Sequence, residues 1–408
     1  MSSSIIAGYA RRNCVQETPH VSHRTPIDPR RPPVSTRPSA APLAALRSRT
    51  PQLLAHLEAL VAVESPSDDL AATGAAADAV DELALSVLGS RCERHGDDGR
   101  VHLCWSGGGP AQVVLVAHVD TVWPLGTTVR WPFRVQHGQA SGPGAFDMKA
   151  GLVQGLHALS LLPDLAGVRL LVTTDEEVGS PTSRGLIEEV ARGAAAALVL
   201  EPSAAGALKS ARKGVSMYEL VVHGRAAHAG LEPEKGVNAG LELAHQLLSL
   251  AAVADPLAGT TVTPTLLAAG STTNTVPATA TAALDVRAAT EAEQLRVDET
   301  LHAAKPVLAG ARLELRGGPN RPPLPATASA DLVARARRLA DALGLSPLHD
   351  VAVGGGSDGN FTAGVGVPTL DGLGAVGDGA HAEGEYVLVA AMAERAALVH
   401  ALVAELLG

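Results

Sequence analysis

Short apolar runs alternate with longer amphipathic stretches along most of the chain. Three runs have the length and composition of buried strands: QVVLVAHVD (112–120), VRLLVTTDEE (168–177) and AALVLEPS (196–203). Stretches with helical spacing of apolar residues lie before and between them, at residues 43–63, 76–88, 148–162 and 183–195. This alternation predicts an α/β fold, with a mostly parallel sheet and helices on both of its faces.

The pattern of apolar and polar residues changes after about Lys209. Strand-like runs at 217–224, 261–270 and 280–290, with a helical stretch at about 237–252, predict a small inserted α+β domain. At about Gly318 the proline-rich segment GGPNRPPLPA returns the chain to the α/β pattern. We therefore expect four parts: a tail (1–42), the first part of the main domain (43–208), the insert (209–318) and the second part of the main domain (319–408).

Residues 1 to about 40 are rich in proline, arginine, serine and threonine, which predicts a flexible tail. Its arginines follow a very short apolar patch, the wrong order for a secretory signal, and no apolar stretch is long enough to span a membrane. Cys14, Cys92 and Cys104 form no CxxC pair, which favours a reducing compartment. The net charge of -10 argues against a nucleic-acid partner. We expect a soluble, cytoplasmic protein.

Polar residues stand at the ends of the predicted strands, where ligands bind in open α/β sheets. His118 follows the apolar run VVLVA, and Asp120, two residues later, faces the same side of an extended segment. A metal-bound imidazole commonly donates its other N–H group to a carboxylate, so Asp120 is a candidate to orient His118. Taken alone, however, an HxD pair more often contains a structural histidine.

Four further motifs contain candidate ligands or catalytic groups: Asp147 in SGPGAFDMKAG, Glu176 and Glu177 in TTDEEVGS, Glu201 in LVLEPS, and His381 in GDGAHAEGEYV. Each also has a simpler explanation: an N-cap aspartate, a solvated acidic loop, a rim carboxylate or a surface histidine. Asp175 lies beside the two glutamates, and three adjacent carboxylates repel unless solvent or a cation relieves them. With a cation, one glutamate would ligate and the other would move protons.

Considered together, these residues indicate metal chemistry. Two nitrogen and three carboxylate ligands suit zinc, and they come from His118, Asp147, Glu177, Glu201 and His381. One carboxylate shared between two ions would leave each ion three protein ligands and a water. Two ions about 3.5–4 Å apart polarise a carbonyl and generate hydroxide near neutral pH. The pattern predicts a two-metal hydrolase.

At these residues the chain resembles the dinuclear zinc family of glutamate carboxypeptidases, acetylornithine deacetylases and succinyl-diaminopimelate desuccinylases. The resemblance runs from about Leu43 to the C-terminus and includes the insert. Five ordered motifs carry it: AHVDTV, GPGAFDMKAG, TTDEEVGS, LEPS and GAHAEGEY. It implies that the main domain is catalytic and that each subunit binds two zinc ions, with cobalt or manganese as possible substitutes.

The resemblance also implies a role for each residue of the motifs. The implied ligands are His118 and Glu201 for one zinc, Glu177 and His381 for the other, and Asp147, in cis peptide linkage to Met148, as the bridge. Asp120 would orient His118. Glu176 would be the general base, taking a proton from the bridging water and later returning it to the leaving amine.

The insert resembles the lid and dimerisation domain of the family, which implies a homodimer. His228, in GRAAHAG, would reach the active site of a second subunit and stabilise the oxyanion, which requires a donor aimed at the developing charge. Asn274 and Arg287 match lid residues that hold substrate. Arg287 suits a carboxylate clamp, although a salt bridge on the strand surface would also explain it. Gly355, Gly356 and Ser357 resemble the loop that faces the carboxylate end of the substrate.

The runs AHVDTVWPLGT, EPSAAGALK and GGGSDGNFTAGVGVPTLDGLG favour the glutamate carboxypeptidase branch. The expected function is therefore the release of a C-terminal amino acid, glutamate above all, from a peptide or N-acyl substrate. An N-acyl-amino-acid deacylase of the acetylornithine or desuccinylase type would use the same machinery. A catalytically silent peptide-binding protein would have lost the base or a ligand, and the motifs contain both. The resemblance gives the tail no role.

Overall fold

The computed structural model describes residues 40–408, apart from residue 98. Almost all of the predicted tail, with Cys14, lies outside the described residues. Cys92 and Cys104 carry free thiols. Within the described part of the chain, no helix is long and apolar enough to cross a membrane.

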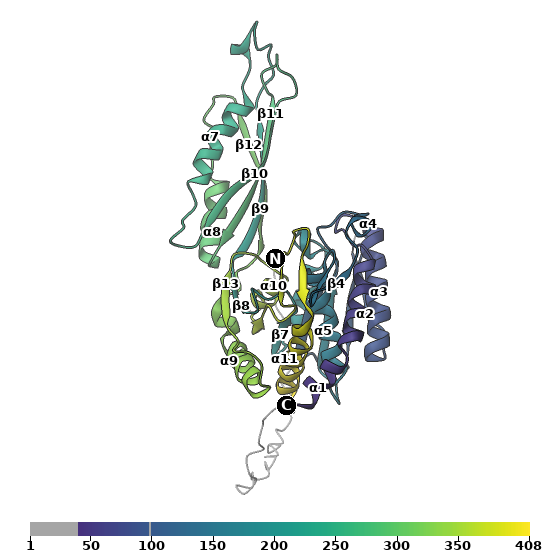
Figure 1. Ribbon diagram of the computed structural model, residues 1–408. Helices are drawn as coiled ribbons and strands as arrows, with labels where there is room; N and C mark the ends of the chain where they lie inside the picture. The colour runs from purple at the N-terminus through teal and green to yellow at the C-terminus, as the bar shows by residue number, and fades with distance from the viewer. Residues whose placement is uncertain (1–39, 98) are drawn as a thin grey trace, which may run out of the picture. The chain divides into compact units, whose positions relative to one another are not determined.

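A six-stranded sheet forms the centre of the main domain (Figure 1). In spatial order its strands are β1 (Glu93–Asp97), β2 (Arg100–Ser106), β6 (Val168–Thr173), β3 (Val113–His118), β7 (Ala196–Val199) and β14 (Thr369–Leu370). The last four strands run parallel to one another, whereas β1 pairs antiparallel with β2, and β2 antiparallel with β6. The predicted mostly parallel sheet is confirmed.

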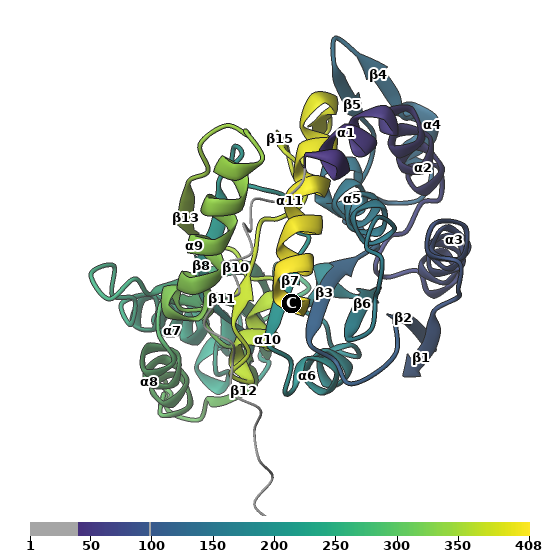
Figure 2. The ribbon, with the colours of Figure 1, turned by 90° about the horizontal axis from the view of Figure 1, so that it is seen from below.

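Helices cover both faces of this sheet (Figure 2), because its strands present apolar side chains on both sides. In β3, Val113 and Leu115 belong to the larger core, whereas Val114 and Val116 belong to a smaller core on the opposite face. The larger core contains α1 (Ala41–Ser48), α2 (Thr50–Ala62), α3 (Leu70–Leu88), α5 (Ala150–Leu159), α9 (Ala326–Ala342) and α11 (Val389–Leu407). The other face carries α6 (Arg184–Ala191) and α10 (Gly359–Gly364).

The prediction of one helix over residues 43–63 is wrong, because α1 ends at Ser48 and α2 begins at Thr50. Pro51 lies in the first turn of α2, where it has no intrahelical N–H bond to lose. Inside a continuous helix its ring would clash with the preceding turn. In contrast, α3 begins at Leu70 rather than at residue 76, because the Asp69 carboxylate caps it by accepting from two backbone N–H groups.

A second sheet has its own helices and its own core. Its antiparallel strands, in spatial order, are β10 (Thr261–Ala269), β11 (Thr279–Ala288), β9 (Gly214–His223) and β12 (Arg312–Arg321). Helices α7 (Ala239–Ala251) and α8 (Glu291–His302) pack on it, with Leu220, Leu243 and Leu284 among the buried contacts. The predicted inserted α+β domain is therefore present.

The ends of the second sheet suggest slightly different bounds for the insert. Strand β8 (Leu208–Arg212) pairs in parallel with β13 (Asp350–Val353), so the first residues after Lys209 remain with the main domain. Strand β12 continues to Arg321, so the first half of the proline-rich segment GGPNRPPLPA is strand. We propose that the insert spans about residues 214–321. A further small sheet consists of β4 (Arg134–Gln136), β5 (Gln139–Ser141), β16 (Tyr386–Leu388) and β15 (Gly377–Asp378).

Two histidines contact each other between α2 and α5. His56 Nδ1 lies 3.0 Å from His157 Nε2, and His157 is buried. Among the described residues, no polar atom contacts His157 Nδ1. Burial, with a smaller effect from His56, lowers the pKa of His157 to about 4. The folded chain therefore holds His157 neutral at a pH where the unfolded chain would protonate it.

We expect the protein to lose stability as the pH falls from about 6.5 toward 4. In this range His157 binds a proton in the unfolded chain but not in the folded chain, so a lower pH favours unfolding. The midpoint of thermal unfolding should fall over this range, and it should fall less in His157→Leu. His245→Leu, at an exposed histidine of α7, is the matched control and should keep the wild-type acid sensitivity. Equal pH slopes for the wild type and His157→Leu would contradict the prediction.

Candidate active site

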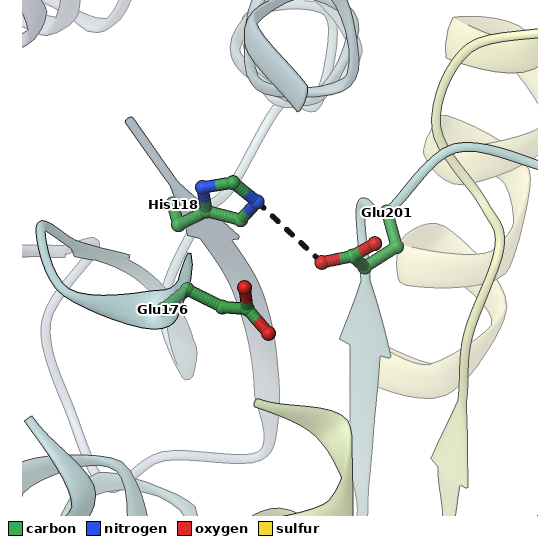
Figure 3. Close-up of side chains that lie close together, drawn as sticks. All are labelled: His118, Glu176 and Glu201. Atoms are coloured by element: carbon green, nitrogen blue, oxygen red, sulfur yellow. Dashed lines mark ion pairs between the residues drawn. The ribbon is translucent and has the colours of Figure 1, made fainter. Parts of the chain in front are cut away.

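Three parallel strands deliver polar side chains to one edge of the central sheet. His118 ends β3, Glu201 comes shortly after β7, and Glu176 follows β6 in the short helix η2 (Glu176–Val178). Because β6, β3 and β7 are adjacent and parallel, their carboxyl ends meet. In Figure 3 the three side chains point toward one another, with His118 Nε2 3.6 Å from Glu201 Oε1.

Asp147 and His381 come from elsewhere in the chain and join this edge. Asp147 lies in the turn before α5, and its peptide bond to Met148 is cis. Its Oδ1 is 3.3 Å from His118 Nε2, and its Oδ2 is 3.4 Å from His381 Nε2. Asp147 thus contacts both histidines, one through each of its carboxylate oxygens. His381 Nε2 also lies 3.1 Å from Glu177 Oε2.

The residues expected to bind metal therefore converge. One atom each from His118, Asp147 and Glu177 lie within 4.8 Å of one another. The same holds for His118, Glu176 and Glu201. Nitrogen and carboxylate donors at this spacing are chemically suited to zinc and related divalent ions.

Asp120 contacts both His118, which it was expected to orient, and the backbone of the acidic motif. His118 Nδ1 is 3.0 Å from the Asp120 carbonyl oxygen and 3.4 Å from Asp120 Oδ1. The buried carboxylate also accepts from Ser67 Oγ at 2.7 Å and from the backbone N–H groups of Glu176 and Glu177, both at 3.2 Å. One carboxylate thus positions the imidazole and the neighbouring acidic segment together.

Asp175, the third carboxylate of the acidic motif, serves the loop. It is buried and accepts from the Thr182 hydroxyl at 2.7 Å and its N–H at 2.8 Å. It also accepts from the Ser183 hydroxyl at 2.5 Å and its N–H at 3.2 Å. These hydrogen bonds stabilise the buried Asp175 carboxylate without solvent. Of the three carboxylates in the motif, Glu176 and Glu177 therefore remain as candidates for the site.

Both histidines hold a proton strongly. Burial would lower the pKa of His118, but its contacts with Asp120 and Asp147 outweigh burial and raise that pKa well above its usual value. Hydrogen bonds with Asp147 and Glu177 raise the pKa of His381 to about 10. The surrounding carboxylates therefore favour positive charge at both rings.

The pKa values of two buried glutamates, Glu201 and Glu176, are raised, so these carboxylates are stabilised by a bound proton or a nearby positive charge. Burial raises the pKa of Glu201 to about 7, and the neighbouring Asp147 carboxylate adds to the effect. Burial likewise raises the pKa of Glu176 well above its usual value, although the Arg321 guanidinium opposes the shift. The cluster thus balances excess acidic charge with bound protons. Divalent cations can replace such protons, so the donor set fits a metal site.

Arg212, which the sequence did not single out, links a proposed metal ligand to the glycine loop. It is buried and binds Asp371 through Nε at 2.7 Å and Nη2 at 3.0 Å. Its Nη2 also lies 3.4 Å from Glu201 Oε2. Its Nη1 donates to the carbonyl oxygens of Gly355 and Gly356, both at 3.1 Å. A single arginine thus fixes both elements.

Arg321, the last residue of β12, was also missed. Its Nη2 lies 2.9 Å from Glu176 Oε1 and 2.9 Å from the Glu176 carbonyl oxygen. The same nitrogen reaches Ser180 Oγ at 2.9 Å and Asp358 Oδ1 at 3.3 Å. Arg321 stands among prolines in the sequence, where nothing signals a buried ion pair.

Glu385 supports the turn that carries Asp147. Its carboxylate accepts from the backbone N–H groups of Gly144, Phe146 and Asp147 and from the Trp123 indole. The last three contacts are 3.2, 3.2 and 3.0 Å long, respectively. Glu385 belongs to the same motif as His381, and that position was the only sequence signal for it.

A cavity of about 350 Å³ opens beside the ligand cluster. Its lining includes Arg287, Gly355 and Gly356, as expected, together with Lys209, Arg212 and Arg321. The salt bridge considered for Arg287 is present, because Nε and Nη2 donate to Asp285 at 2.8 and 2.7 Å. Ser357 is buried, and its hydroxyl donates to Asp371 at 2.6 Å. Ser357 thus contacts a partner of Arg212.

His228 and Asn274 lie elsewhere, exposed on the insert and not among the described residues that line the cavity. Their segments are adjacent, since the Ala229 N–H donates to the Asn274 carbonyl oxygen at 2.9 Å. His228 Nδ1 accepts from the backbone N–H groups of Gly230 and Leu231 at 3.1 and 3.2 Å. Because Nδ1 accepts these two bonds, Nε2 is the ring nitrogen left to donate.

Comparison with known proteins supports the resemblance seen in the motifs. The sequence profile of peptidase family M20/M25/M40 matches residues 114–405. Carboxypeptidase G2 from Pseudomonas sp. (strain RS-16) is 32% identical over 376 residues, which cover 87% of this chain and 89% of that protein. Succinyl-diaminopimelate desuccinylase from Wolinella succinogenes is 26% identical over 67% of this chain and 78% of that protein.

The fold agrees with these matches. The crystal structure of aminopeptidase PepT from Bacillus cereus ATCC 10987 superposes with a TM-score of 0.67 at 22% sequence identity. The superposition covers 88% of this chain and 99% of that one, so the shared architecture includes both the main domain and the insert.

Proposed function

The chain belongs to peptidase family M20/M25/M40, and we propose that it acts as a carboxypeptidase that releases a C-terminal amino acid, preferably glutamate. Membership of the family makes it a metal-dependent hydrolase of the peptidase and amidohydrolase type. The similarity to carboxypeptidase G2 over most of both chains supports the carboxypeptidase branch.

One observation carries the substrate assignment: basic side chains line the same cavity as the acidic ligand cluster. Lys209 and Arg287 are among these basic side chains, and Lys209 Nζ lies 3.9 Å from Glu201 Oε2. Asp285 occupies Nε and Nη2 of Arg287, so the guanidinium is fixed in place with Nη1 remaining for a substrate carboxylate. A C-terminal glutamate carries two carboxylates, one for each basic side chain.

The donor set supports a pair of zinc ions. We assign His118 and Glu201 to one, Glu177 and His381 to the other, and Asp147 to both. When bound, the ions polarise the scissile carbonyl and lower the pKa of a water molecule enough to make hydroxide available near neutral pH.

Glu176 is the proton carrier of this proposal. Arg321 Nη2 binds Glu176 Oε1, so the other carboxylate oxygen is left to accept a proton from the attacking water. The buried surroundings raise the proton affinity of Glu176, which suits a group that must hold the proton during the reaction. Glu176 then gives the proton to the amine nitrogen as the C–N bond breaks. The products are a free carboxylate and a free amino acid.

A second candidate is an N-acyl-amino-acid deacylase, which the similarity to succinyl-diaminopimelate desuccinylase favours. Such an enzyme would use Glu176 and the same ligands, but it would grip the acyl side of the amide. A catalytically silent binding protein is disfavoured, because the chain retains the proposed base and all five proposed ligands.

A substrate panel tests the proposal. We expect turnover of N-acyl glutamates and glutamate-terminated dipeptides, with little turnover of N-acetylornithine or N-succinyl amines. Arg287→Met should raise KM for glutamate substrates by about 10- to 100-fold, because it removes a charge-assisted hydrogen bond to substrate. Arg316→Met, at an exposed arginine of β12, is the matched control. Cleavage of only the acetylated or succinylated amines would reject the carboxypeptidase branch in favour of the deacylase.

We further propose a homodimer formed through the insert, with His228 acting in the neighbouring active site. Strand β10 is an edge of its sheet and exposes Leu266 and Leu267, while α7 exposes Leu241 and Leu248. An exposed apolar edge strand readily pairs with a second copy. The Nε2 donor of His228 suits an oxyanion partner.

Complementation between two inactive variants tests this arrangement. Glu176→Gln and His228→Ala should each be nearly inactive alone. After mixing and subunit exchange, about half of the dimers are mixed, and each mixed dimer holds one complete site if His228 acts across the interface. We therefore expect recovery of about a quarter of wild-type activity. No recovery despite subunit exchange, or only monomer in sedimentation at micromolar concentration, would contradict the proposal.

A further inference from the structure

The main domain contains a second cavity of about 300 Å³, which shares no lining residue with the proposed active site. Its walls come from the turn at 205–207, the segment 345–349 after α9, and one side of α11. Most of the lining is apolar and includes Ala340, Leu345, Pro347 and Leu398. A volume of this size suits a small organic ligand.

One charged residue in this lining stands out. Arg395 of α11 is only 5% exposed, and its Nη2 donates to the Gly206 carbonyl oxygen. Its Nη1 is buried and contacts no acceptor in the described part of the chain. Arg212, which is equally buried, binds a carboxylate through two nitrogens. Within residues 40–408, apart from residue 98, Arg395 therefore makes no ion pair of the kind that a buried guanidinium normally has.

The acidic group nearest in sequence does not form such an ion pair. Glu394 also lines the cavity, and its charge raises the pKa of Arg395 slightly against the effect of burial, but its carboxylate binds Arg47 at 2.9 Å and is partly exposed. Burial lowers the pKa of Arg395 to about 10, so the guanidinium remains charged at neutral pH. A buried charge without a counter-ion is costly, and a bound anion would offset that cost.

We propose that this cavity binds a small carboxylate with an aliphatic body. A carboxylate oxygen accepts a charge-assisted hydrogen bond from Nη1 of Arg395, since Nη2 already donates to the Gly206 carbonyl oxygen. The aliphatic body lies against the alanine, leucine and proline side chains of the lining. The site is separate from the proposed active site, and the inference holds whichever amide the enzyme cleaves.

Hexanoate is a suitable probe, and titration calorimetry on the full chain measures its binding. We expect saturable binding of hexanoate and at least tenfold weaker binding of hexanamide, which has the same body without the charge. Arg395→Met should weaken hexanoate binding at least tenfold. Two controls should bind hexanoate as the wild type does: Arg287→Met in the active-site cavity, and Arg335→Met at an ion-paired arginine of α9.

Three outcomes with the wild type and the arginine variants would overturn the proposal. Equal binding of hexanamide would mean that the cavity recognises only apolar groups, and the absence of saturable hexanoate binding would mean that water satisfies Arg395. Loss of binding in Arg287→Met but not in Arg395→Met would place the carboxylate in the active site. Arg395→Met should not lower the midpoint of unfolding, because removal of the buried charge offsets the loss of its hydrogen bond to the Gly206 carbonyl oxygen. Should it fail to fold, Ala391→Phe narrows the cavity and leaves Arg395 intact. Undiminished binding by that variant would also refute the site.

Discussion

Replacing Glu176 by glutamine is expected to lower kcat by about 100- to 10,000-fold, the usual range for a positioned general base. The amide keeps the shape of the side chain, and its oxygen can still accept from Arg321 Nη2, which binds Glu176 Oε1 at 2.9 Å. It cannot accept a proton from water. KM and metal content should therefore stay near their wild-type values while turnover collapses. Steady-state kinetics and elemental analysis of the same preparation measure all three quantities.

Glu177→Gln is the informative comparison, because the neighbouring glutamate contacts His381 Nε2 at 3.1 Å and is a proposed ligand. In that variant the metal content should fall along with turnover. If Glu176→Gln also lost metal, Glu176 would be acting as a ligand. Near wild-type turnover in Glu176→Gln would remove it from the mechanism altogether.

Removal of the metal is expected to reduce turnover by about 1,000-fold or more, since the ions supply several kcal/mol of stabilisation to the reacting groups. Dialysis against a chelator followed by stepwise addition of zinc should restore activity, with saturation at about two ions per chain. Cobalt and manganese should restore part of it. Asp147→Asn should block the restoration, because Asp147 contacts both His118 and His381 and is the proposed bridge.

The same experiment has a structural readout. Binding to the folded state alone stabilises that state, so chelation should also lower the midpoint of thermal unfolding. Asp164→Asn, an aspartate in an exposed turn before β6, should behave as the wild type in both assays. Full activity after the metal content has fallen below about a tenth of an ion per chain would exclude the metal mechanism.

Much of the site could be predicted because it follows from strand order. His118, Glu177 and Glu201 stand at or just beyond the ends of apolar runs, and parallel neighbouring strands bring such ends together. Asp147 and His381 lie outside these strands, so only their motifs indicated them. The alternation of runs and amphipathic stretches likewise predicted the central sheet and the insert.

The supporting arginines could not be predicted, because their partners are far away in the sequence. Arg321 reaches Glu176 only because β12 returns the chain to the main domain, and proline-rich composition concealed that strand. Arg212 looks like an ordinary basic residue until its five donor contacts are seen. Burial of a charge depends on tertiary packing, which local pattern does not report.

The contacts of Arg212 have a consequence for protein engineering. Because one guanidinium holds both Glu201 and the carbonyl oxygens of Gly355 and Gly356, the glycine loop cannot be redesigned independently of the proposed metal centre. Gly356 has no room for change, since a Cβ there would lie 2.7 Å from Val215 Cγ2. Lys209 is tied to the same centre, because its Nζ lies 3.9 Å from Glu201 Oε2. Substrate range is better altered at Arg287, which lines the cavity and pairs with Asp285 of the insert. A library restricted to Arg287 would sample new substrates while leaving the proposed metal ligands and their contacts unchanged.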